Sequence, residues 1–418
     1  MNKRNDIELI LVGDELLKGE RSDAHLAWLG RTLLRTGVRI ARAQAVGDAV
    51  EAITEAVRES AARARVVIVT GGLGPTVDDV TRDGVAAALG LELAFDEPTW
   101  EGIVAFFAAR GFQASESNRR QAMFPRGAHI LGNAQGTAPG FAVERDDLTV
   151  FVLPGPPLEM RPMVEADVRA RVAEIFAREA LRVETFRTAG IGESQMVSML
   201  GPGIERAEGY VVSFLPSLLG VDVVLTQAPG AGADAPLARE AERVERLLRE
   251  HLGAKLYEHG ERSLAQVVHD LLVARGETLG VAESLTGGSI GKALTDFAGA
   301  SAYFLAAAVT YSDASKRAML GVAAETLARF GAVSEETCTE MAHGMRRAVG
   351  ATYGVATTGI AGPTGGSAKK PVGLCYLGLA WDGGCHVKRV RYRGARDTVR
   401  LRATHGALWL LYDHMAAR

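Results

Sequence analysis

The stretch Val281-Ala-Glu-Ser-Leu-Thr-Gly-Gly-Ser-Ile-Gly291 joins an apolar segment to an amphipathic one. Residues 278–282 have the composition of a short buried strand, and the residues after the glycines place apolar side chains on one helical face. The pattern predicts a strand, a glycine-rich corner carrying Ser284, and a helix. Free N–H groups at such a corner bind an anion or a developing oxyanion, and a serine held there is a nucleophile if a base takes its proton. A capped helix start with glycines for tight packing is the alternative.

A second strand-to-glycine junction lies in the N-terminal part of the chain. Val66-Val-Ile-Val-Thr70 reads as a buried parallel strand and leads directly into Gly71-Gly-Leu-Gly-Pro-Thr-Val-Asp-Asp-Val-Thr81. Strands and helices alternate around it, which predicts an α/β fold with a doubly wound sheet and a ligand site at the carboxyl ends of the strands. The third glycine of a dinucleotide fingerprint is missing.

Acidic pairs follow two of these strand ends, namely Asp14-Glu15 and Asp78-Asp79. Carboxylates beside a glycine turn that accepts phosphate would suit a divalent metal bridging to a pyrophosphate. The alternative is that Asp78 or Asp79 only caps the next helix.

The composition describes a soluble globular protein of several domains. With 418 residues the chain exceeds one ordinary core, and 47% hydrophobic and 23% charged residues are typical globular values. The net charge of −3 gives no reason to expect a nucleic-acid groove or a membrane-binding surface. No apolar run is long enough to span a bilayer. The three cysteines are odd in number and lack metal-ligand spacing, so we expect a reduced, cytoplasmic protein.

Changes in composition and element pattern predict three domains. Residues 1–172 form the doubly wound unit, residues 173–257 a small α+β unit, and residues 258–418 a second α/β unit rich in glycine, alanine and threonine. The middle unit carries no convincing catalytic motif. We expect it to act as a spacer or in dimerisation.

The C-terminal unit presents polar side chains at three predicted strand ends: Ser284, Tyr311 with Lys316, and Thr358. A metal-free amide hydrolase needs a nucleophile, a base and an oxyanion hole. Ser284 supplies the first, and the N–H groups of Thr286, Gly287 and Gly288 supply the last. Lys316 is a base only if burial lowers its pKa from ~10.4 toward neutrality, and Tyr311 would relay or orient the proton. The alternatives are a solvated lysine, a half-buried tyrosine and a β-forming threonine.

Two other motifs predict no site. Ser289-Ile-Gly-Lys292 matches S-x-x-K, but the companion elements of β-lactamase-type enzymes are absent and Lys292 would face solvent on a helix. Gly362-Pro-Thr-Gly-Gly-Ser-Ala-Lys-Lys370 resembles a phosphate loop but has no G-K-[ST] element.

Taken together, the motifs resemble those of the CinA family over essentially the whole chain. The C-terminal ones are Ala282-Glu-Ser-Leu-Thr-Gly-Gly288, Val309-Thr-Tyr-Ser312 with Lys316, Gly331-Ala-Val-Ser334, Thr358-Gly-Ile-Ala-Gly-Pro-Thr-Gly-Gly-Ser367 and Lys370-Pro-Val-Gly373. The N-terminal ones are Gly13-Asp-Glu-Leu-Leu17, Thr70-Gly-Gly-Leu-Gly-Pro-Thr-Val-Asp-Asp79, Gly136-Thr-Ala-Pro-Gly140 and Leu153-Pro-Gly-Pro-Pro157.

The resemblance implies that the C-terminal domain is a nicotinamide mononucleotide (NMN) amidohydrolase that releases ammonia and nicotinate mononucleotide without a cofactor. It assigns the role of nucleophile to Ser284, the role of base to Lys316 and the role of their partner to Tyr311. Substrate contacts fall on Thr286, Gly287, Gly288, Thr358, Gly359 and Arg396. A homodimer, with neither a nucleic acid nor a membrane as partner, is expected.

For the N-terminal half the resemblance implies a molybdopterin-binding-like domain with metal-dependent ADP-ribose pyrophosphatase activity. Asp79 is the expected metal ligand, in a site formed by Asp14, Glu15, Gly72, Gly74, Asp78 and Asp79. Four positions depart from the family pattern: Ala24 and His25 follow Asp23 where Asp-Thr-Asn is usual, Val224 stands where arginine is common, and Leu285 stands where cysteine is common. A non-catalytic adaptor in competence or DNA repair is the rival function.

Overall fold

A computed structural model describes residues 6–178, 180–228, 230–231 and 234–418. The chain divides into two compact units, Met1–Arg182 and Val183–Arg418. None of the described helices is long and apolar enough to cross a membrane.

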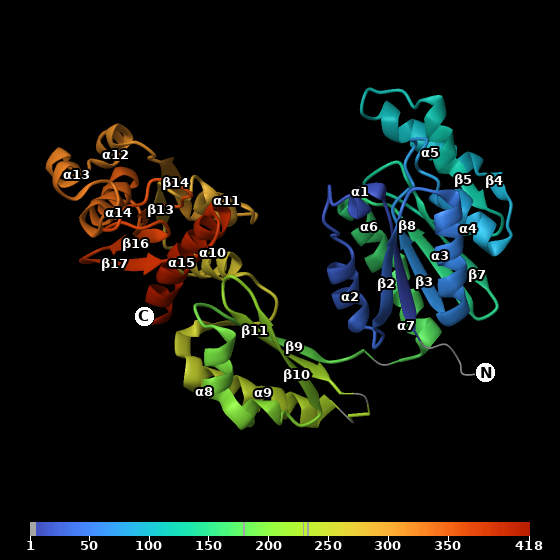
Figure 1. Cartoon of the computed structure of the whole chain (residues 1–418), viewed down its shortest axis with the longest axis horizontal. Helices are drawn as coiled ribbons and strands as arrows, with labels where there is room; N and C mark the ends of the chain where they lie inside the picture. Colours follow the sequence, from blue (N-terminus) through green and yellow to red (C-terminus); the bar gives the residue numbers. More distant parts are fainter. Residues whose placement is uncertain (1–5, 179, 229, 232–233) are drawn as a thin grey trace. The chain divides into compact units, whose positions relative to one another are not determined.

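The first unit is built on a six-stranded sheet (Figure 1). Its first four strands in spatial order are parallel, and the fifth runs opposite to them and pairs antiparallel with both the fourth and the sixth. The order is β2 (Ile40–Val46), β1 (Ile7–Val12), β3 (Val66–Thr70), β8 (Leu148–Leu153), β7 (Gly140–Arg145) and β6 (His129–Leu131). Because β2 and β3 lie on opposite sides of β1, the carboxyl end of β1 is the point where the winding direction reverses, and ligand sites form at such points.

Helices cover both faces of this sheet, which confirms the doubly wound fold. One core joins the sheet to α2 (Leu26–Leu34), α6 (Pro157–Met163) and α7 (Arg169–Phe176). The other core joins it to α3 (Val50–Arg63) and α4 (Thr81–Leu89). The shorter or peripheral elements are α1 (Asp14–Leu17), β4 (Leu93–Phe95), α5 (Glu97–Ala108), η1 (Glu116–Ala122), β5 (Met123–Pro125) and η2 (Val164–Val168).

The second unit begins with a small antiparallel sheet backed by two helices. The strand order is β10 (Tyr210–Pro216), β11 (Val221–Gln227), β9 (Val183–Thr188) and β12 (Leu256–His259), and the core packs against α8 (Glu193–Glu205) and α9 (Asp234–Leu252). The expected domain boundaries at 172/173 and 257/258 fall inside α7 and β12. Pairing of β12 with β9 places Glu258 and His259 in the middle sheet, although composition changes at Glu258.

The rest of the second unit is a five-stranded sheet with helices on both faces. The order is β14 (Phe304–Val309), β13 (Leu279–Glu283), β15 (Tyr353–Gly359), β16 (Leu374–Trp381) and β17 (Gly384–Arg391), with the first three strands parallel. One face packs against α10 (Leu264–Arg275), α11 (Ser289–Thr295) and α15 (Arg396–Ala416). The other packs mainly against α14 (Glu335–Val349), with α12 (Asp313–Leu320) and α13 (Ala324–Phe330). The carboxyl end of β13, flanked by β14 and β15, is the reversal point of this sheet.

Candidate active site at the Ser284 turn

Ser284 lies at that reversal point, in the turn between β13 and α11. Its N–H donates to the carbonyl of Thr357 on β15 at 3.0 Å, which extends the parallel pairing by one residue past the strand. The residue is 9% exposed, so its hydroxyl is largely shielded from water. The strand, corner and short helix predicted from the sequence are therefore present.

The fully buried carboxylate of Glu283 anchors the start of α11. It accepts hydrogen bonds from three backbone N–H groups: Gly288 at 2.9 Å, Ile290 at 3.2 Å and Gly291 at 2.9 Å. A carboxylate at this position satisfies N–H groups that otherwise lack partners at a helix start and interacts favourably with the helix dipole.

This anchor changes which backbone groups of the turn are free for a substrate. The Gly288 N–H is taken by Glu283, and the Gly287 N–H donates to the carbonyl of Ser284 at 3.2 Å. The N–H groups of both glycines therefore have acceptors within the protein, whereas the sequence analysis expected them to face the substrate. The side chain of Thr286 is also internal, since its hydroxyl lies 2.7 Å from that of Thr357.

Lys316, on α12, brings a buried amine to the nucleophile. Its Nζ atom lies 3.3 Å from Ser284 Oγ and 2.7 Å from the carbonyl oxygen of Thr310, and the residue is 1% exposed. Burial lowers the pKa of the amine, and the nearby Asp313 carboxylate opposes this shift only in part. The structure thus brings together the serine and lysine that the sequence analysis paired, and excludes the solvated-lysine alternative.

Among the described residues, Tyr311 makes no hydrogen bond to Ser284 or Lys316. It is 60% exposed, and its hydroxyl accepts a hydrogen bond from Arg396 Nη2 at 2.7 Å, while Arg396 Nη1 donates to the Gly362 carbonyl at 2.8 Å. The structure thus pairs Tyr311 with Arg396, and a proton relay through Tyr311 stays a prediction.

Thr358 and Gly359 shape the neighbouring strand end. The buried hydroxyl of Thr358 donates to the Ala332 carbonyl at 2.7 Å and so ties β15 to the segment before α14. A Cβ atom at Gly359 would lie 2.6 Å from the Leu374 carbonyl oxygen, which only glycine avoids. Both residues hold the backbone in place, which agrees with the structural alternative for Thr358 and was not expected for Gly359.

Arg400, on α15, was missed by the sequence analysis. Its Nε donates to the Leu285 carbonyl at 3.1 Å and its Nη2 to the Thr286 carbonyl at 3.0 Å. Position 400 follows a helical pattern like any surface arginine, so no local signal marks it. By contrast, Lys292 of the S-x-x-K motif pairs with Asp296 at 2.6 Å and is 75% exposed, as expected for a residue outside the site.

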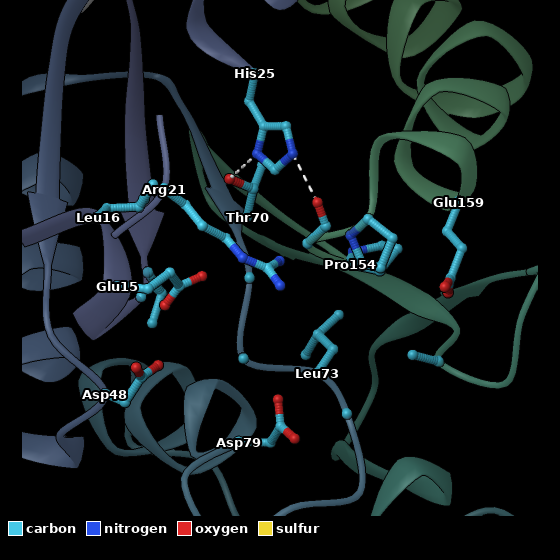
Figure 2. Close-up of a pocket in the computed structure, with 18 of the residues that line it drawn as sticks. Glu15, Leu16, Arg21, His25, Asp48, Thr70, Leu73, Asp79, Pro154 and Glu159 are labelled. Carbon is cyan, nitrogen blue, oxygen red and sulfur yellow. Dashed lines mark hydrogen bonds between the residues drawn. The ribbon is translucent and has the colours of Figure 1, made fainter. Parts of the chain in front are cut away.

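The first unit holds a cavity of about 670 Å³ at the carboxyl ends of β1, β3 and β8 (Figure 2). Gly72 and Gly74 of the glycine turn line it, as predicted. Its titratable lining is mostly acidic, while Figure 2 shows Arg21 extending into its middle. The carboxylates that line it belong to Glu15, Asp23, Asp48, Asp78, Asp79 and Glu159.

Asp14 and Asp79 differ from the expectation in detail. Asp14 does not line the cavity, because its carboxylate pairs with Lys18 at 2.9 Å and accepts from the Asp48 N–H at 3.3 Å. Asp79 lines the cavity and accepts from the N–H and the hydroxyl of Thr76. The residue preceding α4 makes no side-chain capping bond, so the helix-cap alternative for Asp78 and Asp79 does not hold.

His25 bridges two strand ends at the rim of this cavity (Figure 2). Its Nε2 lies 2.7 Å from the carbonyl oxygen of Gly155, and its Nδ1 lies 2.9 Å from the hydroxyl oxygen of Thr70. A carbonyl only accepts, so Nε2 carries a proton and donates. Burial lowers the pKa of this imidazole. His25, which stands where the family commonly has asparagine, thus links the segment after β8 to the end of β3.

The carboxylates do not form a closed metal cage. Within the described residues, no group of three or more His, Cys, Asp or Glu side chains is arranged to hold a metal ion. Magnesium is commonly bound through one or two carboxylates, with water and substrate phosphate oxygens completing its shell. Asp79 beside the glycine turn fits that mode of binding.

Comparison with known proteins covers almost the whole chain. Residues 261–415 match the CinA C-terminal domain, residues 8–174 the probable molybdopterin binding domain, and residues 183–258 the damage-inducible protein CinA KH domain. A CinA-like protein of Kosmotoga olearia is 38% identical over 401 residues, which are 96% of this chain and 97% of the relative. The chain belongs to the CinA family.

Two further similar proteins match the whole chain and part of it, respectively. A Caldanaerobacter subterraneus protein, which bears the name competence-damage inducible protein, is 38% identical over 411 residues, 98% of each chain. The solved structure of the competence/damage inducible protein CihA from Agrobacterium tumefaciens is 45% identical and covers 35% of this chain and 91% of its own, with a TM-score of 0.35.

The two sites lie in different matched domains. Ser284, Lys316 and Arg400 lie within the CinA C-terminal domain, and the acidic cavity lies within the molybdopterin binding domain match. The middle unit, which the sequence analysis described only as a small α+β block, is the CinA KH domain.

Proposed function

We propose that the C-terminal domain hydrolyses the carboxamide of NMN to nicotinate mononucleotide and ammonia. The observation that carries this proposal is the contact of a buried lysine amine with the oxygen of a serine at a strand-to-helix turn. A lysine is a general base only when its pKa is lowered, and burial lowers that of Lys316.

In the proposed mechanism the neutral amine of Lys316 takes the hydroxyl proton of Ser284 as Oγ attacks the carboxamide carbon. A C–O bond forms, and the carbonyl oxygen becomes an oxyanion. The Lys316 ammonium then gives its proton to the leaving nitrogen, the C–N bond breaks, and ammonia departs from an acyl-serine ester. Water, deprotonated by Lys316, hydrolyses that ester and frees Ser284 and a carboxylate.

The Thr310 carbonyl gives Lys316 its orientation in this scheme. One N–H of the amine donates to that carbonyl at 2.7 Å, which directs the rest of the nitrogen toward Ser284. The choice of NMN as substrate rests on the family motifs around Ser284, Lys316 and Thr358. Arg396, on which the family motifs also place a substrate contact, would offer its guanidinium to the phosphate or ribose of the nucleotide, and in the structure it donates to the Tyr311 hydroxyl at 2.7 Å.

Product analysis tests this function. Purified full-length protein is incubated with NMN, and ammonia and nicotinate mononucleotide are quantified over time. The proposal expects both products in equal amounts. Absence of both from a folded protein would contradict it.

A second proposed function belongs to the acidic cavity of the first unit. Its size, its glycine turn and Asp79 support hydrolysis of a nucleoside diphosphate sugar such as ADP-ribose with a divalent metal. Asp79 would hold the ion, and the ion would neutralise pyrophosphate charge that the acidic lining alone would repel. Cleavage of ADP-ribose with Mg²⁺, and none with EDTA, is the expected result.

A further inference from the structure

The turn after Ser284 contains backbone N–H groups of two kinds. Those of Gly287, Gly288 and the following residues have acceptors within the turn or on Glu283. The N–H groups of Leu285 and Thr286 have no acceptor among the residues that the structure describes. Two neighbouring donors next to a nucleophile are what a developing oxyanion requires, and the N–H of the residue after the nucleophile commonly serves as one of them.

Arg400 sets the direction of one of these donors. In a trans peptide the C=O and the following N–H point in opposite directions, and the Leu285–Thr286 peptide is trans. Arg400 Nε draws the Leu285 carbonyl toward α15 at 3.1 Å, so the Thr286 N–H points away from α15. The second bond, from Nη2 to the Thr286 carbonyl at 3.0 Å, holds the next peptide of the turn, so Thr286 is fixed on both sides.

The bond to the Leu285 carbonyl also strengthens the Thr286 N–H as a donor. A guanidinium that donates to a carbonyl withdraws electron density from the peptide unit and makes its N–H a better donor, an effect that is larger away from water. Glu283 fixes the turn from the other end, because it holds the N–H groups at the start of α11. Arg400 thus holds the turn through its carbonyls, and Glu283 holds it through its N–H groups.

We propose that the N–H groups of Leu285 and Thr286 form the oxyanion hole of the Ser284 site and that Arg400 is the residue that positions the Thr286 N–H. This inference rests on the proposed role of Ser284 as nucleophile. Arg400 touches neither Ser284 nor Lys316 in any hydrogen bond of the described structure, so it acts only through the backbone of the turn.

The test compares Arg400→Gln and Arg400→Lys with Arg346→Gln in the full chain. Arg346 is the matched control, since its Nε also donates to a backbone carbonyl, that of Thr352, which precedes β15 at the opposite end of the sheet. With NMN, Arg400→Gln is expected to lower kcat about 10- to 100-fold with KM changed less than about threefold, because the oxyanion forms only in the transition state. The kcat of Arg400→Lys should lie between those of Arg400→Gln and wild type, and the kcat of Arg346→Gln should equal that of wild type.

A second measurement is independent of the substrate. A fluorophosphonate labels a nucleophilic serine through an anionic intermediate, so the rate of Ser284 labelling reports the oxyanion hole directly. Arg400→Gln should slow labelling by a factor similar to its loss in kcat. Labelling slowed by Arg400→Gln in a protein that leaves NMN intact would support the oxyanion hole and contradict the NMN assignment. The inference would be overturned if Ser284 were labelled at the same rate in Arg400→Gln, Arg346→Gln and wild type. It would also be overturned if Arg400→Gln and Arg346→Gln lowered the labelling rate and the melting temperature to the same extent.

Discussion

Lys316 Nζ and Ser284 Oγ are 3.3 Å apart although 32 residues separate them in the chain. The contact arises because β13 and β14 are parallel neighbours, so the segments after both strands meet at one edge of the sheet. Lys316 follows β14 by less than two helical turns on α12, whose start is capped by Ser312. The helix therefore places the Lys316 amine next to the Ser284 hydroxyl.

Removal of either partner should abolish deamidation. Lys316→Ala is expected to lower single-turnover ammonia release from NMN by about 10³-fold or more, and the Ser284→Ala/Lys316→Ala double variant should be hardly worse, because the two residues act as one unit. Lys316→Arg should also fail, since a guanidinium does not deprotonate in this range.

Lys292→Ala is the matched control for these variants. Lys292 is a lysine of the same domain, exposed and paired with Asp296, and its loss should leave the rate unchanged. An active Lys316→Arg enzyme would mean that Lys316 supplies only positive charge, and the base would have to be another group.

The rate should rise with pH. Lys316 acts as a base in its neutral form, and burial lowers its pKa. The plot of log kcat/KM against pH should therefore climb with unit slope and level off at a pH below the ordinary lysine value of ~10.4. A midpoint at or above that value, measured by initial rates in constant-ionic-strength buffers, would show that the amine is not desolvated in the free enzyme.

The sequence was sufficient for much of the fold because the strands are continuous apolar runs with glycine turns at their ends. It also paired Ser284 with Lys316. It did not reveal Glu283, because one carboxylate inside a strand pattern has no periodic signature. Arg400 and His25 act through contacts 114 and 130 residues away in the chain, and only the folded backbone brings such partners together. The hydrogen bond between Tyr311 and Arg396 was not foreseen for the same reason, since Arg396 lies 85 residues beyond Tyr311.

Stability should depend on the same lysine. The folded pKa of Lys316 is lower than the unfolded one, so between these two values only the unfolded chain binds the proton, and stability rises with pH across that window. Below the folded pKa the buried ammonium destabilises the native state. Lys316→Met should therefore be inactive yet more stable, by about 1 kcal/mol at neutral pH, and should lack this pH dependence. Urea unfolding of both proteins at several pH values measures it; an unaltered slope in the variant would refute the linkage.

The two sites should respond differently to metal. EDTA should leave NMN deamidation intact, because the serine–lysine chemistry needs no cation, and should abolish any cleavage of ADP-ribose. Asp79→Asn should remove only the ADP-ribose activity, while Asp83→Asn serves as the control for loss of a nearby carboxylate that is outside the cavity lining. Simultaneous loss of both activities with EDTA, restored by Mg²⁺, would count against the serine mechanism.

The most direct test of the central claim is detection of the acyl-serine ester. Full-length protein is mixed with excess NMN, quenched in acid within milliseconds to seconds, digested and analysed by mass spectrometry, with ammonia measured in parallel. The account predicts that a pyridinium acyl adduct appears on the peptide containing Ser284 as ammonia is released, and that Ser284→Ala binds NMN but forms neither. Ammonia release by Ser284→Ala at the wild-type rate would contradict it.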